Sequence, residues 1–152
     1  MRKIVSIIPM LFALLLTACA TVPSTPVLTL EGAAIGGYDV VAYQTEEKAV
    51  KGNEQFTSLY NESVWRFASA ENKAKFDADP VKYAPQYGGY CAYGLSNGFI
   101  IDSDPEAFSL VDGKLYLNNT PSVRDTWLEN TSYYISNADV SWEKAKAKAA
   151  KK

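Results

Sequence analysis

The sequence contains no histidine and only two cysteines among its 152 residues. Without an imidazole, catalysis of the Ser-His-Asp or Cys-His type is excluded, and the commonest metal ligand is missing. The sequence also lacks an excess of positive charge, with 15 basic residues against 17 acidic ones, so it gives no sign of a nucleic-acid partner. These absences favour a protein that is not an enzyme and does not bind nucleic acid.

The first 18 residues have the organisation of an export signal. Met1–Lys3 is a short basic start, and residues 4–16 are apolar apart from Ser6 and Pro9. The apolar run is too short for a helix that spans a membrane, whereas its length and flanks are typical of a secretory signal peptide. Residues 1–18 are therefore predicted to be a signal peptide.

The segment that ends this signal, Leu16-Thr17-Ala18-Cys19, resembles the lipobox of bacterial lipoproteins. The resemblance implies cleavage before Cys19 and acylation of that cysteine, with palmitate as one acyl group, so that the chain is attached to a lipid bilayer. Ala20 stands where lipoproteins retained at the inner membrane carry aspartate, which implies the outer membrane, facing the periplasm. With Cys19 acylated, Cys91 has no partner for an intramolecular disulfide.

Composition divides the rest of the chain into three parts. Residues 19–35 are predicted to be a lipidated flexible tether, because small residues and prolines dominate its first half and glycine its end. Within it, Val27–Leu30 either continues the tether or adds an edge strand. Residues 36–142 are long enough for one domain with a modest core. Residues 143–152 are predicted to be a basic helix end or tail.

Local patterns predict a small α+β domain with antiparallel hairpins and short helices. Hairpins are expected from two aromatic or apolar runs, 56–60 with 64–67, and from 109–111 with 114–117 across an Asp-Gly turn. Further strands are expected at 38–43 and 98–102.

Helix starts are expected where a capping residue precedes a helical pattern. The capping residues are Ser69, Asp79, Asp104 and Thr120, and the last precedes two C-terminal helices, 123–129 and 133–150.

Several of these motifs together resemble the YHS domain family. The match is carried by the segment Val64–Tyr83, which ends in Asp79-Pro80-Val81-Lys82-Tyr83, and by Gly37–Tyr43, Gly88–Tyr93 and Val111–Asn118. The resemblance covers Gly36 to Trp142 and implies a YHS-like α+β fold with a link to metal handling in the cell envelope.

The expected metal ligands of that family are absent from this sequence. Where metal-linked members carry cysteines, in the turn after the hairpin and inside the helix, this chain has Ala68 and Asn72. The Tyr-His-Ser triplet falls on Phe56-Thr57-Ser58. The cofactor is therefore unknown, because the resemblance suggests a metal while its cysteine and histidine ligands are missing.

The candidate ligand or redox residues gather in a tyrosine- and glycine-rich stretch and on the expected early strand. In one interpretation Cys91 is a redox thiol, a single soft metal ligand or a covalent attachment point. In the other it is a small buried hydrophobic residue. Tyrosines and one aspartate either line a pocket of hydroxyl groups or form an aromatic core. These residues are Tyr38, Asp39, Tyr43, Tyr87, Tyr90 and Tyr93.

Two charged groups admit a functional and a simpler interpretation. Asp102 and Asp104 would suit calcium, although Asp104 is explained as a helix cap. The lysines of the C-terminal tail would suit an anionic membrane or wall surface, or form a solvated helix end.

Together these observations predict a periplasm-facing lipoprotein whose YHS-like domain is a binding or accessory module for a metal or a small ligand. Its expected partners are the bilayer, through Cys19, and an envelope protein. The alternatives are a thiol-based redox function centred on Cys91 and a structural envelope protein without a ligand.

Overall fold

A computed structural model describes residues 26–151 of the chain. The signal peptide and the acylated Cys19 predicted above lie outside these residues. The described part is a small α+β domain, as predicted, with three antiparallel pairs of strands and helices between and after them. No helix in the described part is long and apolar enough to cross a membrane.

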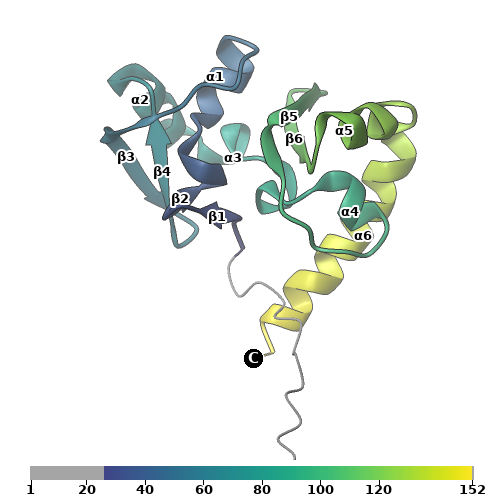
Figure 1. The fold of residues 1–152 in the computed structure, drawn as a ribbon. Helices are drawn as coiled ribbons and strands as arrows, with labels where there is room; N and C mark the ends of the chain where they lie inside the picture. Colours follow the sequence, from purple (N-terminus) through teal and green to yellow (C-terminus); the bar gives the residue numbers. More distant parts are fainter. Residues whose placement is uncertain (1–25, 152) are drawn as a thin grey trace, which may run out of the picture.

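Strands and short helices alternate along the first two thirds of the domain (Figure 1). In order they are β1 (Thr29–Leu30), β2 (Ala33–Ala34), the 3-10 helix η1 (Ile35–Gly37), α1 (Val40–Thr45), β3 (Asn53–Tyr60), β4 (Ser63–Phe67), α2 (Ala70–Ala78), α3 (Pro80–Tyr83), the 3-10 helix η2 (Gln86–Gly89), α4 (Ala92–Ser96), β5 (Asp104–Val111), β6 (Lys114–Asn118), α5 (Pro121–Leu128) and α6 (Thr131–Ala149).

Both predicted hairpins are confirmed, and each turns on two residues with positive φ. Strands β3 and β4 are joined by Asn61 and Glu62, with φ of 47° and 60°, and β5 and β6 by Asp112 and Gly113, with φ of 51° and 73°. Positive φ at both central residues matches the right-handed twist of the paired strands, which fixes the register of each hairpin.

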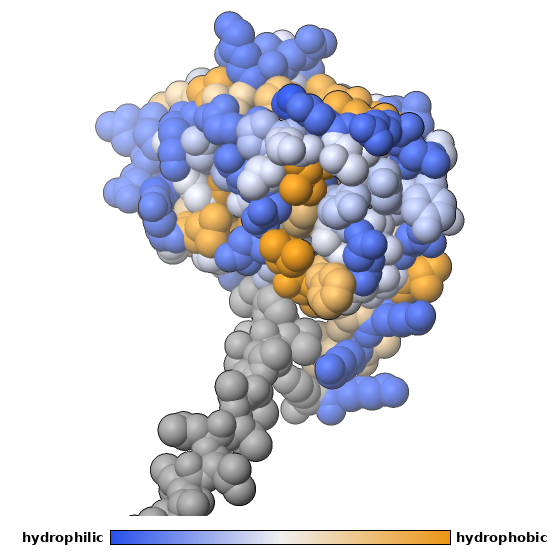
Figure 2. All heavy atoms as spheres, turned by 45° about the vertical axis from the view of Figure 1, so that its right-hand side comes forward, coloured by the Kyte–Doolittle hydropathy of each residue, from blue (hydrophilic) through white to orange (hydrophobic). Residues whose placement is uncertain are grey.

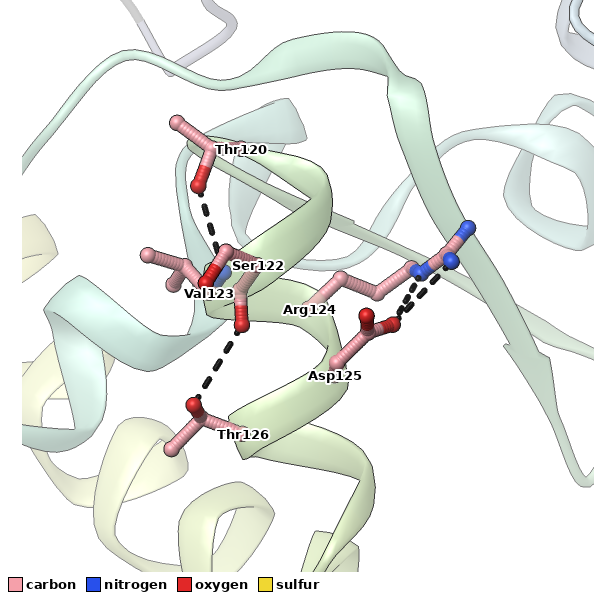
Figure 3. Close-up of polar contacts among 6 residues, drawn as sticks. All are labelled: Thr120, Ser122, Val123, Arg124, Asp125 and Thr126. Carbon is pink, nitrogen blue, oxygen red and sulfur yellow. Dashed lines mark hydrogen bonds and ion pairs between the residues drawn. The ribbon is translucent and has the colours of Figure 1, made fainter.

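The helices begin where side chains satisfy their first N–H groups. Ser69 Oγ accepts from Asn72 N at 3.1 Å, and Thr120 Oγ1 accepts from Val123 N at 3.2 Å. Figure 3 shows the Thr120 cap, with Thr126 Oγ1 donating to the Ser122 carbonyl one turn further along α5. The predicted caps at Ser69, Asp79 and Thr120 are confirmed.

Three local predictions are wrong. Residues 38–43 do not form a strand, because Asp39 caps the helix α1, whose first residues Val40 and Val41 are fully buried. Residues 98–102 form a turn and an extended segment outside any strand. Asp104 does not start a helix but the strand β5, where its side chain accepts from Glu106 N at 2.9 Å.

The flexible tether predicted for residues 19–35 is wrong for the part from Val27 onward. Val27 and Leu28 are 2% and 4% exposed, and residues 33–35 are completely buried. Apolar side chains removed from water in this way stabilise the fold, so this segment belongs to the domain core.

The core consists of two clusters with one strand between them. The first cluster lies among β2, α1, β4 and α2, on the left of Figure 1, and includes Trp65 and Phe76. The second lies among η2, α4, α5 and α6, on the right, and includes Trp127. Side chains of β6 alternate between them, with Leu115 and Leu117 in the first cluster and Tyr116 in the second.

Candidate functional site

The tyrosines singled out from the sequence do not form one pocket. Tyr43 is buried in the first cluster, against which Tyr38 packs, whereas Tyr87 and Tyr90 are buried in the second, against which Tyr93 packs. The hypothesis of a shared hydroxyl-lined pocket is therefore wrong, because β6 separates the two groups of rings.

Asp39 is a completely buried carboxylate whose two oxygens are both occupied. Oδ1 accepts from Val41 N at 2.9 Å and from Ala42 N at 3.3 Å, which caps α1. Oδ2 accepts from Ala68 N and from Asn72 Nδ2, each at 2.8 Å. A buried carboxylate with four donors is stabilised where it lies and has no lone pair left for a ligand.

These contacts fill the place where the YHS resemblance would put metal-binding cysteines. Ala68 and Asn72, the two residues at those positions, both donate to Asp39 Oδ2. Within residues 26–151 no group of three or more histidine, cysteine, aspartate or glutamate side chains is arranged to hold a metal ion. The donors here form a closed hydrogen-bond network that ties α1 to α2.

The hydroxyls of two buried tyrosines are held by partners inside the domain, and that of the partly exposed Tyr38 donates to Glu106 at 3.1 Å. Tyr43 donates to the Pro105 carbonyl at 2.9 Å, and Tyr87 donates to Asp139 Oδ1 at 2.8 Å. Burial raises the pKa of both phenols, and the Asp139 carboxylate raises that of Tyr87 further. Both therefore stay neutral donors at physiological pH and tie distant segments together.

Cys91 is buried, with 1% of its surface exposed, and it caps the helix α4. Its sulfur accepts from Gly94 N at 3.4 Å and from Asn119 N at 3.2 Å, and the thiol donates to Asn118 Oδ1 at 3.8 Å. Each hydrogen-bonding capacity of the thiol is thus used by the surrounding backbone and side chains. The geometry is that of a structural cap.

The two glycines before Tyr90 allow a close approach of the N-terminal segment. Gly88 has a φ of +62°, and a Cβ on it would lie 2.0 Å from the Pro26 carbonyl oxygen. Leu28 N donates to the Gly88 carbonyl at 2.8 Å, which lays residues 26–28 across η2. A side chain at Gly88 would displace this segment.

This crossing forms one wall of a cleft of about 290 Å³ between the two halves of the domain. Four aromatic residues line it: Tyr60 at the tip of the β3–β4 hairpin, Trp65, Tyr87 and Trp142 of α6. The other lining residues are Pro26, Val27, Asn61, Val81, Ala84, Pro85, Gln86, Gly88 and Lys146. Aromatic residues beside hydrogen-bonding amides occur together in many small-ligand sites.

The cleft is lined by polar residues of three kinds. They are the amides Asn61 and Gln86, the cationic Lys146, and the tyrosines Tyr60 and Tyr87. Amides offer both donors and acceptors to a ligand, and an ammonium offers donors alone.

Sequence reasoning singled out Tyr87 alone among the lining residues. The others come from residues 26–27, the β3–β4 hairpin, the segment 81–88 around Tyr87, and α6, and no local pattern links these four parts of the chain. The one available signal was the concentration of tryptophan and tyrosine, because large aromatic rings must pack together or remain partly exposed.

Comparisons of the chain with protein-family models, with curated proteins and with solved structures gave no match.

Proposed function

We propose that this protein is a lipid-anchored envelope lipoprotein whose domain is a non-catalytic module that binds a small ligand in the aromatic cleft. The observation that carries the proposal is the cleft itself, in which the aromatic residues Tyr60, Trp65, Tyr87 and Trp142 meet the amides of Asn61 and Gln86 and the side chain of Lys146. The anchor is supported by the lipobox-like sequence that ends at Cys19.

The ligand that best suits these walls has a flat apolar face and hydrogen-bonding edges. Aromatic rings offer apolar contact area, and Asn61 and Gln86 each offer both a donor and an acceptor. A sugar ring has this division, with C–H groups on its face and hydroxyl groups at its edge. We therefore propose a saccharide as the ligand class.

Tryptophan fluorescence tests the proposal, because Trp65 and Trp142 both line the cleft. The full chain, purified from membranes as cells process it, is titrated with neutral, amino and N-acetylated mono- and disaccharides. At least one sugar is expected to change the emission in a saturable manner. A panel that leaves both the emission and the melting temperature unchanged would contradict the proposal.

A matched pair of variants locates the binding. Val81 lines the cleft and is 73% exposed, whereas Leu59 is 78% exposed and does not line it. Val81→Glu places a charge at the cleft wall and is expected to weaken binding at least about tenfold, the cost of one desolvated, unpaired polar contact. Leu59→Glu is expected to bind like the parent. Equal weakening by both variants would argue against this site.

A further inference from the structure

Helix α6 presents one face to the domain and an opposite face to solvent. Its inner face packs on the second cluster through Tyr134, Ile135, Ala138 and Trp142. Residues 147–151 are all exposed, so the last turns project beyond the domain, as the yellow end of α6 in Figure 1 shows.

The outer face of α6 carries aromatic, aliphatic and basic side chains. At 100° per residue these side chains fall within an arc of about 80°, opposite Trp142. They are Tyr133 and Val140, which are 60% and 55% exposed, and the exposed Lys144 and Lys148, and the exposed Lys151 follows just after the helix ends at Ala149. We call these five residues the α6 outer face.

Among residues 26–151, no carboxylate forms an ion pair with the lysines of this face. From Val140 to Lys151 the chain has four lysines and one glutamate, although the whole chain has a net charge of −2. That glutamate, Glu143, pairs with Lys146 at 2.7 Å on the side of the cleft. Figure 2 shows the hydrophilic side chains along the projecting end of α6.

The basic end lies on the side of the domain from which the chain leads back to Cys19. Pro26, the first described residue, lines the same cleft as Lys146. Cys19 precedes Pro26 by seven residues, so covalent geometry limits their separation to about 25 Å. An anchor at Cys19 would therefore hold the basic C-terminal end of α6 close to the bilayer.

We propose that the α6 outer face docks on an anionic phospholipid surface, the surface of the membrane that holds the anchor. Lysines near such a surface are attracted by about 1 kcal/mol each, about fivefold in partitioning, and the attraction fades within a Debye length. Tyr133 and Val140 suit the interfacial layer, where amphipathic and apolar groups are favoured. This inference rests on the proposed anchor.

Lysine accessibility tests the docking on the full chain as cells process it. The protein is reconstituted into vesicles of phosphatidylcholine alone or mixed equally with phosphatidylglycerol, and acetylation of each lysine is followed by mass spectrometry. Three exposed lysines that lie outside α6 are the matched controls. These controls are Lys48, Lys82 and Lys114.

Acetylation of Lys144, Lys148 and Lys151 is expected to slow at least about fivefold on the anionic vesicles and to recover in high salt. The control lysines are expected to react equally on both. If each of the six lysines is acetylated at the same rate on the anionic vesicles as on the neutral ones, the docking is overturned. The intact mass of the same sample shows whether Cys19 is acylated. If Cys19 carries no acyl group, the proposed anchor is wrong. Slower acetylation of the α6 lysines in an excess of anionic vesicles would still show that the α6 outer face docks without the anchor.

Discussion

The sulfur of Cys91 accepts hydrogen bonds from Gly94 N and Asn119 N while only 1% of the residue is exposed. Both N–H groups would lose their acceptor if the sulfur were removed, and water could not replace it at this depth. A buried donor without a partner costs about 1–3 kcal/mol. The thiol therefore contributes to stability through its lone pairs, whatever its redox chemistry.

Replacing Cys91 separates this role from reactivity. Cys91→Ala is expected to lower the free energy of unfolding by about 2 kcal/mol, because the buried Gly94 N and the part-buried Asn119 N lose their acceptor. Cys91→Ser retains an acceptor and is expected to lose less than half of that. Urea denaturation measures both, and an alanine variant as stable as the parent would contradict the cap.

Alkylation gives an independent measurement on the unmodified chain. We expect the Cys91 thiol to resist iodoacetamide in the native protein and to react once the protein is unfolded, because a thiolate must be accessible to react. Rapid modification of the native protein would favour the thiol-based redox alternative.

Elements with strong local signals were predictable from the sequence, and those decided by tertiary contacts were not. The β5–β6 hairpin follows from Asp112-Gly113, and α2 from the cap Ser69, since both signals act within four residues. Helix α1 escaped prediction because Val40 and Val41 favour strands, whereas the Asp39 network and complete burial hold them in a helix.

The same division applies to the candidate site. Cys91, Tyr87 and the glycines could be singled out as unusual, yet their roles depend on neighbours far along the chain. Cys91 meets Asn119, Tyr87 meets Asp139, and Gly88 meets Pro26.

The crossing of residues 26–28 over η2 depends on one glycine. In Gly88→Ala the new Cβ would meet the Pro26 carbonyl oxygen, so the segment must move and the Leu28–Gly88 hydrogen bond must break. We expect a loss of about 3 kcal/mol, of which about 1 kcal/mol is the cost of positive φ for alanine. Amide exchange at Leu28 should become fast.

Gly98→Ala is the matched control for this variant. Gly98 also has a positive φ, of +82°, but no atom lies within 4 Å of the position its Cβ would take. Gly98→Ala is expected to lose only about 1 kcal/mol of unfolding free energy, the cost of positive φ for alanine, and to leave amide exchange at Leu28 unchanged. Equal losses in the two variants would show that backbone strain alone matters at Gly88.

At the scale of the whole molecule, β6 makes the two clusters depend on each other. Leu115 and Leu117 are completely buried in the first cluster, and Tyr116, between them, is 3% exposed in the second. Unfolding of either cluster would expose one side of β6 to water. The cleft that we propose as the binding site lies between the same two halves, so its shape depends on both clusters being folded.

We therefore expect the two clusters to unfold in one cooperative transition, as small single domains usually do. Hydrogen exchange measured by mass spectrometry at increasing urea follows peptides from β3–β4 for the first cluster and from α5–α6 for the second. Their midpoints should coincide, because loss of either cluster leaves β6 half exposed and its apolar side chains in water. Two separated midpoints would contradict this coupling and would mean that the cleft can open while one half of the domain remains folded.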